Sequence, residues 1–149
     1  MKTKKQAFPL PFIGEYVGDG LAQFKPYKPF KYIDENPKDS VTVPIYDPKV
    51  DFKTDGGSIP PIAYLLIGSP WRGKYIEAVI IHDWECYHAK TLAERKKADK
   101  KFHKMLTILG VAHWRRRAMY RGVRMGAWWN KKKILAKGKK LPKSPKDYS

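Results

Sequence analysis

Several features that define familiar protein classes are scarce in this sequence. Its 149 residues include one cysteine, Cys86. That excludes an internal disulfide framework and predicts folding in a reducing cytoplasm. No apolar run approaches the roughly 20 residues that a membrane-spanning helix needs. The basic N-terminus has Pro9 and Pro11 within its apolar stretch and no small-residue cleavage site after it. We therefore expect neither a transmembrane segment nor a signal peptide.

Acidic residues are also scarce. The chain has 14 Asp and Glu against 31 Lys and Arg, a net charge of +17. Such an excess predicts an anionic partner, namely a phospholipid surface, nucleic acid or an acidic virion protein. From residue 111 onward there are thirteen Lys or Arg and one acid, and Trp114, Tyr120, Trp128 and Trp129 lie among the basic residues. This mixture favours a binding surface over a tail that only aids solubility. The residues expected to contact the partner are Arg115, Arg116, Arg117, Arg121, Arg124, Lys131, Lys132 and Lys133.

The order of patterns along the chain predicts an α+β fold. Residues 1–50 are rich in proline and aromatics and indicate short strands and loops. Helices are expected at about 74–90, 91–109 and 111–129, the first two forming an antiparallel pair. Thr91 with Glu94 fits a capping box, and Gly110 fits a helix stop. We expect one domain over 1–130 and a basic, flexible tail over 131–149, with no internal repeat.

Two ionisable residues interrupt the apolar faces of the first two predicted helices. On a 3.6-residue period, His82 lies in the stripe of one helix and Asp99 in the stripe of the other. The turn near Lys90 leaves them at nearly equal distances on opposite sides, so contact between them is expected. A histidine partner relieves the cost of a buried carboxylate and orients the imidazole, whose second nitrogen can point into a cleft. A polar staple between the helices explains the same pair.

Other candidate site residues surround this pair. Asp83 points about 100° away from His82 around the helix and could bind a divalent cation. The stretch "TDGGSIPP", residues 54–61, supplies a second candidate ligand and a permissive backbone, although a tight turn explains it equally well. One cysteine offers no zinc-ligand pattern. The metal candidates are Asp83 and Asp55, and the supporting or substrate-binding candidates are Ser58, Gly56, Gly57, Tyr87 and Arg72.

Four motifs in order resemble a family of small, mostly phage-encoded proteins known as domain-of-unknown-function family 1353. They are "TDGGSIP", "HDWECY", "ADKKFHKML" and "AMYRGVRMG". The resemblance implies a phage or prophage origin. The protein is then expected in the host cytoplasm during infection, with incorporation in the virion as the alternative.

"HDWECY" followed by a helix with "ADKKF" is also similar to the core of phospholipases A2. That resemblance implies that His82 activates water, Asp99 orients His82 and Asp83 binds calcium. The chain lacks the closely spaced glycines of the usual calcium loop and the family's disulfides.

Three functions follow from these patterns. The first is a metal-assisted hydrolase acting on an ester or phospholipid at the bacterial envelope, with His82 and Asp99 as catalytic residues. The second is a structural or assembly component of a phage head or tail. The third is a nucleic-acid-binding module. Its alternative is a core role for the same part of the third helix, which explains equally well Trp114, Ala118, Tyr120, Met125 and Trp129.

Overall fold

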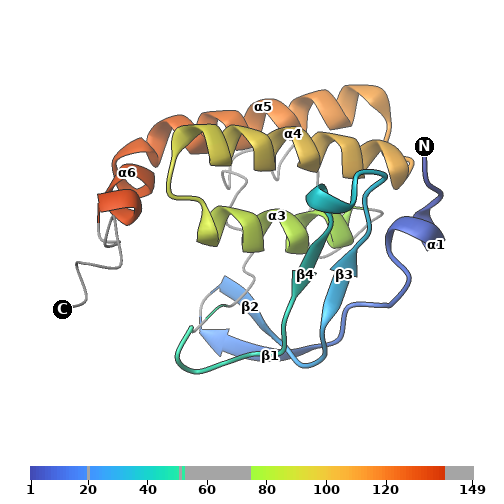
Figure 1. Ribbon diagram of the computed structural model, residues 1–149, viewed down its shortest axis with the longest axis horizontal. Coiled ribbons are helices and arrows are strands. Elements are labelled where there is room, and N and C mark those ends of the chain that lie inside the picture. The colour runs from blue at the N-terminus through green and yellow to red at the C-terminus, as the bar shows by residue number, and fades with distance from the viewer. Residues whose placement is uncertain (20, 51, 53–74, 140–149) are drawn as a thin grey trace.

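Two small β-sheets precede a group of helices in the described part of the chain. In the computed structural model, the described residues are 1–19, 21–50, 52 and 75–139. Strands come first in the chain and the long helices follow, as Figure 1 shows. The predicted α+β class is confirmed.

Both sheets are antiparallel strand pairs. Strand β1 (Gly14–Asp19) pairs with β2 (Leu21–Pro26), and β3 (Phe30–Tyr32) pairs with β4 (Val41–Val43). Along β3 the side chains of Phe30 and Tyr32 are buried and that of Lys31 is exposed, the alternation of a half-buried strand. The short helix α1 (Lys4–Ala7) and the 3₁₀ turn η1 (Pro37–Asp39) flank this pair. The second sheet thus contributes one face of the core.

The helices begin and end close to the predicted positions. They are α3 (Ile76–His88), α4 (Leu92–Ile108) and α5 (His113–Trp129). Thr91 and Glu94 form the expected capping box at the start of α4. At its end Gly110 has φ 73°, and the Val111 amide donates to the Leu106 carbonyl at 3.1 Å. This Schellman arrangement reverses the chain and sets α5 alongside α4.

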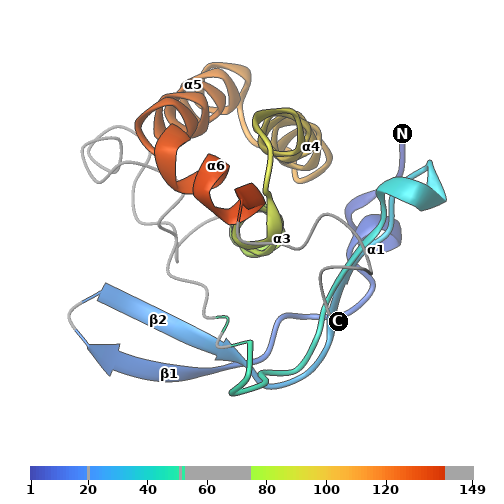
Figure 2. The same cartoon turned by 60° about the vertical axis from the view of Figure 1, so that its left-hand side comes forward.

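Helix α3 lies in the middle of the molecule. It lies between α4 and the β3–β4 pair, and Figures 1 and 2 show α4 and α5 on one side of it. Six consecutive residues, from Ala78 to Asp83, are buried. A helix that is buried on all sides at its centre presents no single wet face. Its neighbours in the core include Phe30, Val43, Phe102, Met105, Leu106, Met119 and Val123.

Residues 131–139, predicted to be part of a flexible tail, are helical in the structure. They form a further helix, α6 (Lys131–Lys139), in which Ile134 is buried. Lys137 donates to the carbonyls of Cys86 and Tyr87 at 3.1 and 3.0 Å. One apolar anchor and one lysine at a helix C-terminus therefore hold a segment whose composition is otherwise basic. Residues 140–149 lie outside the described part.

Among the described residues, no helix combines the length and apolar character that crossing a bilayer requires.

Candidate functional site

The predicted contact between His82 and Asp99 is confirmed. His82 Nε2 lies 2.6 Å from Asp99 Oδ1, and the two residues come from α3 and α4 as expected. Both side chains are almost completely buried, with 1% and 0% of their surface exposed. The His82 ring also packs against Phe102, with ring centroids 4.7 Å apart.

Two arginines complete the surroundings of Asp99. Arg95 Nε donates to Oδ1 at 3.0 Å from one helical turn away, and Arg124 donates from α5 to Oδ2 at 2.7 Å. Arg95 also donates to the Val123 carbonyl at 3.2 Å. We call His82, Arg95, Asp99 and Arg124 the Asp99 network. It joins α3, α4 and α5 through one carboxylate that accepts three charge-assisted hydrogen bonds.

The protonation states follow from this crowding. Burial works against the ionised carboxyl of Asp99, yet hydrogen bonds from His82 and Arg95 keep its pKa below the ordinary value. Burial also disfavours a charged His82, but Cys86 and Asp99 outweigh that effect and raise the pKa of His82 to about 10. His82 is then an imidazolium at neutral pH. A general base needs a pKa near the working pH and a free nitrogen, so this state is unsuited to taking a proton.

The expectation that His82 presents a wet nitrogen is wrong. The ring is enclosed, and Cys86 Sγ lies 3.7 Å from Nδ1 and 3.4 Å from Nε2. Asp83, predicted to bind a divalent cation, is buried as well. The cause is the central position of α3, because neighbouring elements pack on both sides of it and enclose the histidine.

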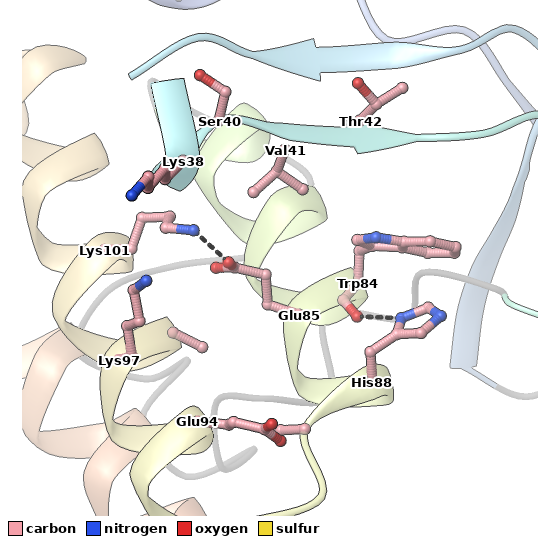
Figure 3. Close-up of a pocket in the computed structure, with 12 residues that line it drawn as sticks. Lys38, Ser40, Val41, Thr42, Trp84, Glu85, His88, Glu94, Lys97 and Lys101 are labelled. Carbon is pink, nitrogen blue, oxygen red and sulfur yellow. Dashed lines mark hydrogen bonds and ion pairs between the residues drawn. The ribbon is translucent and has the colours of Figure 1, made fainter. Parts of the chain in front are cut away.

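A surface cavity of about 440 Å³ lies beside α3 without reaching the Asp99 network. Figure 3 shows Trp84, Glu85 and His88 of α3 on one side of it, facing Lys97 and Lys101 of α4. Lys101 forms an ion pair with Glu85 inside this cavity. Neither His82 nor Asp99 is among the lining residues, so the cavity gives a substrate no path to the histidine.

Among the described residues, the group of side chains that could offer ligands to a metal ion has surroundings that oppose binding. Ligand atoms of His82, Cys86 and Asp99 lie within 4.8 Å of one another. However, the Asp99 oxygens already accept hydrogen bonds from two guanidinium groups, whose charge opposes a divalent cation. Calcium needs six to eight oxygen ligands, which this group does not offer. The predicted ligand Asp55, with Gly56, Gly57, Ser58 and Arg72, lies outside the described residues, so a calcium site there stays a prediction.

The residues predicted to bind an anionic partner separate into two groups. Arg117, Arg121 and the three lysines 131–133 are exposed. Arg124 instead joins the Asp99 network, and Arg116 donates to the Val111 carbonyl at 3.0 Å. Arg115 is half-buried, with its guanidinium 5.2 Å from the ring centre of Trp114.

The core interpretation is wrong for Trp114, Met125 and Trp129 of α5, which are exposed, whereas Ala118 and Tyr120 pack against the core. Trp114, Met125 and Trp129 have 58%, 49% and 57% of their surface exposed, and Trp128 has 72%. Helical spacing places three of these residues along one line with the exposed Arg117 and Arg121. We call this line the α5 stripe, which consists of Trp114, Arg117, Arg121, Met125 and Trp128.

Tyr87, a supporting candidate, is exposed on α3. Its hydroxyl donates to the Val50 carbonyl, and Lys137 lies 5.7 Å from its ring centre. These contacts attach α6 and the end of the N-terminal half to α3. They give Tyr87 a structural role.

The ion pairs that Arg95 and Arg124 form with Asp99 were not predicted from sequence. Arg95 was visible on the apolar stripe four residues before Asp99, a spacing that signals an ion pair along a helix. Arg124 carried no such signal, because its partner lies 25 residues away.

Comparison with known families adds the remaining observation. The family model described as "Protein of unknown function (DUF1353)" matches residues 25–123. The chain belongs to this family. The match covers α3, α4 and most of α5, so His82, Arg95 and Asp99 lie within the family domain and Arg124 directly follows the matched residues.

Two curated relatives of this DUF1353 protein come from Sinorhizobium fredii. "Uncharacterized protein y4iH" is 54% identical over 43 residues, which are 28% of this chain and 18% of that protein. "Uncharacterized protein y4jT" is 34% identical over 68 residues, 46% of this chain and 20% of that protein. The matched segments thus span about a fifth of each relative. No solved structure matches the chain.

Proposed function

We propose that this protein is a binding module whose α5 stripe and the start of α6 dock onto nucleic acid. The observation that carries the proposal is the exposure of Trp114 and Trp128 on the same helix face as Arg117 and Arg121. Large apolar side chains gathered on a monomer surface are typical of interaction sites. Arginine beside tryptophan is the pairing that phosphate contacts and base stacking require.

The charges of α5 and α6 favour a polyanion as the binding partner. Helices α5 and α6 contain ten Lys or Arg and no Asp or Glu. Among the described acidic residues, none forms an ion pair with Arg117 or Arg121. Both guanidinium groups are therefore available to an external anion. Lys131, Lys132 and Lys133 continue the positive charge beyond the stripe.

The Asp99 network supports this role by fixing α5. Arg124 extends inward from α5 to Asp99, whereas Arg121 and Met125, which flank it along the helix, are exposed. The inner face of α5 is packed through Met119 and Val123. The network acts in this proposal as the polar staple that holds a basic helix on the protein, which is the non-catalytic interpretation of the pair.

The test is retention of nucleic acid by the full chain as a function of salt. Replacing Arg117 and Arg121 together by Gln should weaken binding and lower the slope of log affinity against log salt by about 1.4 to 1.8, since each phosphate contact contributes about 0.7 to 0.9. The matched control replaces Lys28 and Lys31, exposed lysines of the N-terminal half, by Gln. Equal loss in both variants, or binding that does not change with salt, would contradict the proposal.

A role in a phage particle is the larger setting that the family resemblance favours. A small basic module can hold packaged or entering nucleic acid within a head or tail. Quantitative mass spectrometry of purified particles from a phage that encodes this chain tests that setting. Copies in fixed stoichiometry support a virion component, and absence from particles places its action in the host cell.

Ester hydrolysis is the second candidate, and the 2.6 Å contact between His82 and Asp99 favours it. Water must reach His82, which is enclosed, and the imidazole must be neutral. The assay incubates the protein with mixed phospholipids and calcium. Fatty acid release that is lost in His82→Gln supports hydrolysis, whereas no release with any divalent cation excludes it.

A further inference from the structure

The α5 stripe is long and straight enough to follow a polymer. Its members are separated by three, four, four and three residues, which keeps them on one face of a helix. The fourteen steps from Trp114 to Trp128 correspond to about 21 Å at 1.5 Å per residue. Figures 1 and 2 show α5 at the edge of the helical group, with α4 on its inner side. Trp114 near the start of α5 and Trp128 near its end are both exposed, so the stripe runs along most of the helix.

Tryptophan marks both ends of this line, and arginine lies between. Trp114 and Trp128 are 58% and 72% exposed, so much of each indole is open to a flat ligand. Arg117 and Arg121 lie eleven and seven residues before Trp128, between the two tryptophans. A partner that fills the stripe must offer flat rings to the two ends and negative charge between them.

A nucleic acid duplex meets only half of this requirement. Its phosphates can pair with Arg117 and Arg121, but its base faces are covered by neighbouring base pairs. An indole gains access to them only by insertion, which costs unstacking energy. An unpaired strand presents both base faces and phosphates, and base stacking on aromatic side chains is sequence-tolerant.

We infer that the occupant of the α5 stripe is single-stranded nucleic acid, whose unpaired bases stack on Trp114 and Trp128 while its phosphates pair with Arg117 and Arg121. This inference rests on the proposed nucleic-acid function and narrows it. At a rise of about 3.4 Å per nucleotide the stripe covers about six nucleotides, and fewer if the strand is extended. Lys131, Lys132 and Lys133 hold the strand beyond Trp128.

The experiment measures fluorescence anisotropy of labelled 12-nucleotide DNA and RNA strands and of the 12-base-pair DNA duplex, each titrated with the full chain. Single strands should bind at least tenfold more tightly than the duplex. The double variant Trp114→Ala, Trp128→Ala should lose at least tenfold in affinity for single strands and change duplex affinity by less than twofold. Because both side chains are exposed, this variant is expected to remain folded. Tyr27→Ala, which removes an exposed aromatic ring of the N-terminal half, is the matched control.

The outcomes separate the two proposals. Equal affinity for strand and duplex, unaffected by loss of the two tryptophans, overturns the single-strand inference and leaves nucleic-acid binding in place. Binding of neither probe overturns both. A third titration uses vesicles of anionic phospholipid. Tight vesicle binding without oligonucleotide binding overturns both proposals in favour of a membrane surface.

Discussion

Replacing Asp99 by Asn tests whether the buried network holds the helices together. The substitution keeps the shape of the side chain but removes the charge that faces His82, Arg95 and Arg124. Removing one partner from a buried ion pair costs about 3–5 kcal/mol, because the remaining charge stays desolvated. His82 can release its proton and so reduce the penalty. Arg95, with 7% of its side chain exposed, cannot.

We therefore expect Asp99→Asn to lower the free energy of unfolding by about 3 kcal/mol at pH 7. Urea unfolding followed by tryptophan fluorescence measures it. With a slope of about 1–3 kcal/mol per molar urea, the midpoint should fall by about 1–3 M. In a thermal scan the midpoint should fall by about 6–12 °C.

The matched control is Asp39→Asn. Asp39 also accepts a close lysine contact, 2.6 Å from Lys97, but both side chains are partly or largely exposed. Surface pairs of this kind contribute little, so the unfolding midpoint should hardly change. A loss of less than 1 kcal/mol in Asp99→Asn, or an equal loss in both variants, would show that the network is not the staple described above.

Two further predictions concern the histidine and the last helix. Folding raises the pKa of His82 from 6.5 to about 10, so the free energy of unfolding should fall as the pH rises through that window, by at most about 1.4 kcal/mol per pH unit. Urea unfolding at pH 6 to 10 should show this slope in the wild type and lose it in His82→Gln; an unchanged slope in the variant would assign it to another group. Ile134→Ala, which removes the buried anchor of α6, should increase amide hydrogen exchange over 131–139, whereas Leu135→Ala at an exposed neighbouring position should not. Equal exchange in both variants would mean that Ile134 does not hold α6.

Local patterns predicted the helices well, because their signals lie in neighbouring residues. The capping box at Thr91 and the stop at Gly110 depend on contacts within four or five residues, which a sequence displays directly. The contact between His82 and Asp99 was predictable too, since a short turn and helical periodicity fix which residues face each other across an antiparallel pair.

The surroundings of that pair were not predictable, because they come from distant parts of the chain. The histidine was expected to point one ring nitrogen into a cleft. The apolar run Ala78–Ile81 was the available signal that α3 is enclosed instead. Arg124 approaches Asp99 from another helix, and only the packing of α5 on α4 brings it there. The helix α6 was hidden by its lysine-rich composition, because a single buried isoleucine is a weak periodic signal.

A histidine and an aspartate on facing helices suit both a hydrolytic site and a structural staple. The number of further hydrogen-bond partners that the two side chains have distinguishes a hydrolytic site from a structural staple. A catalytic aspartate that orients a histidine must leave the imidazole free to accept and release protons near neutral pH. Asp99 instead accepts hydrogen bonds from two arginines as well, and the histidine beside it is enclosed and carries a raised pKa. A catalytic pair would expose its charge to substrate. Here the charge of Asp99 is paired inside the protein, and one of the arginines that pair with it, Arg124, lies on α5, the helix that carries the α5 stripe. In this arrangement the buried chemistry holds the binding surface in place, and the exposed tryptophans and arginines meet the partner.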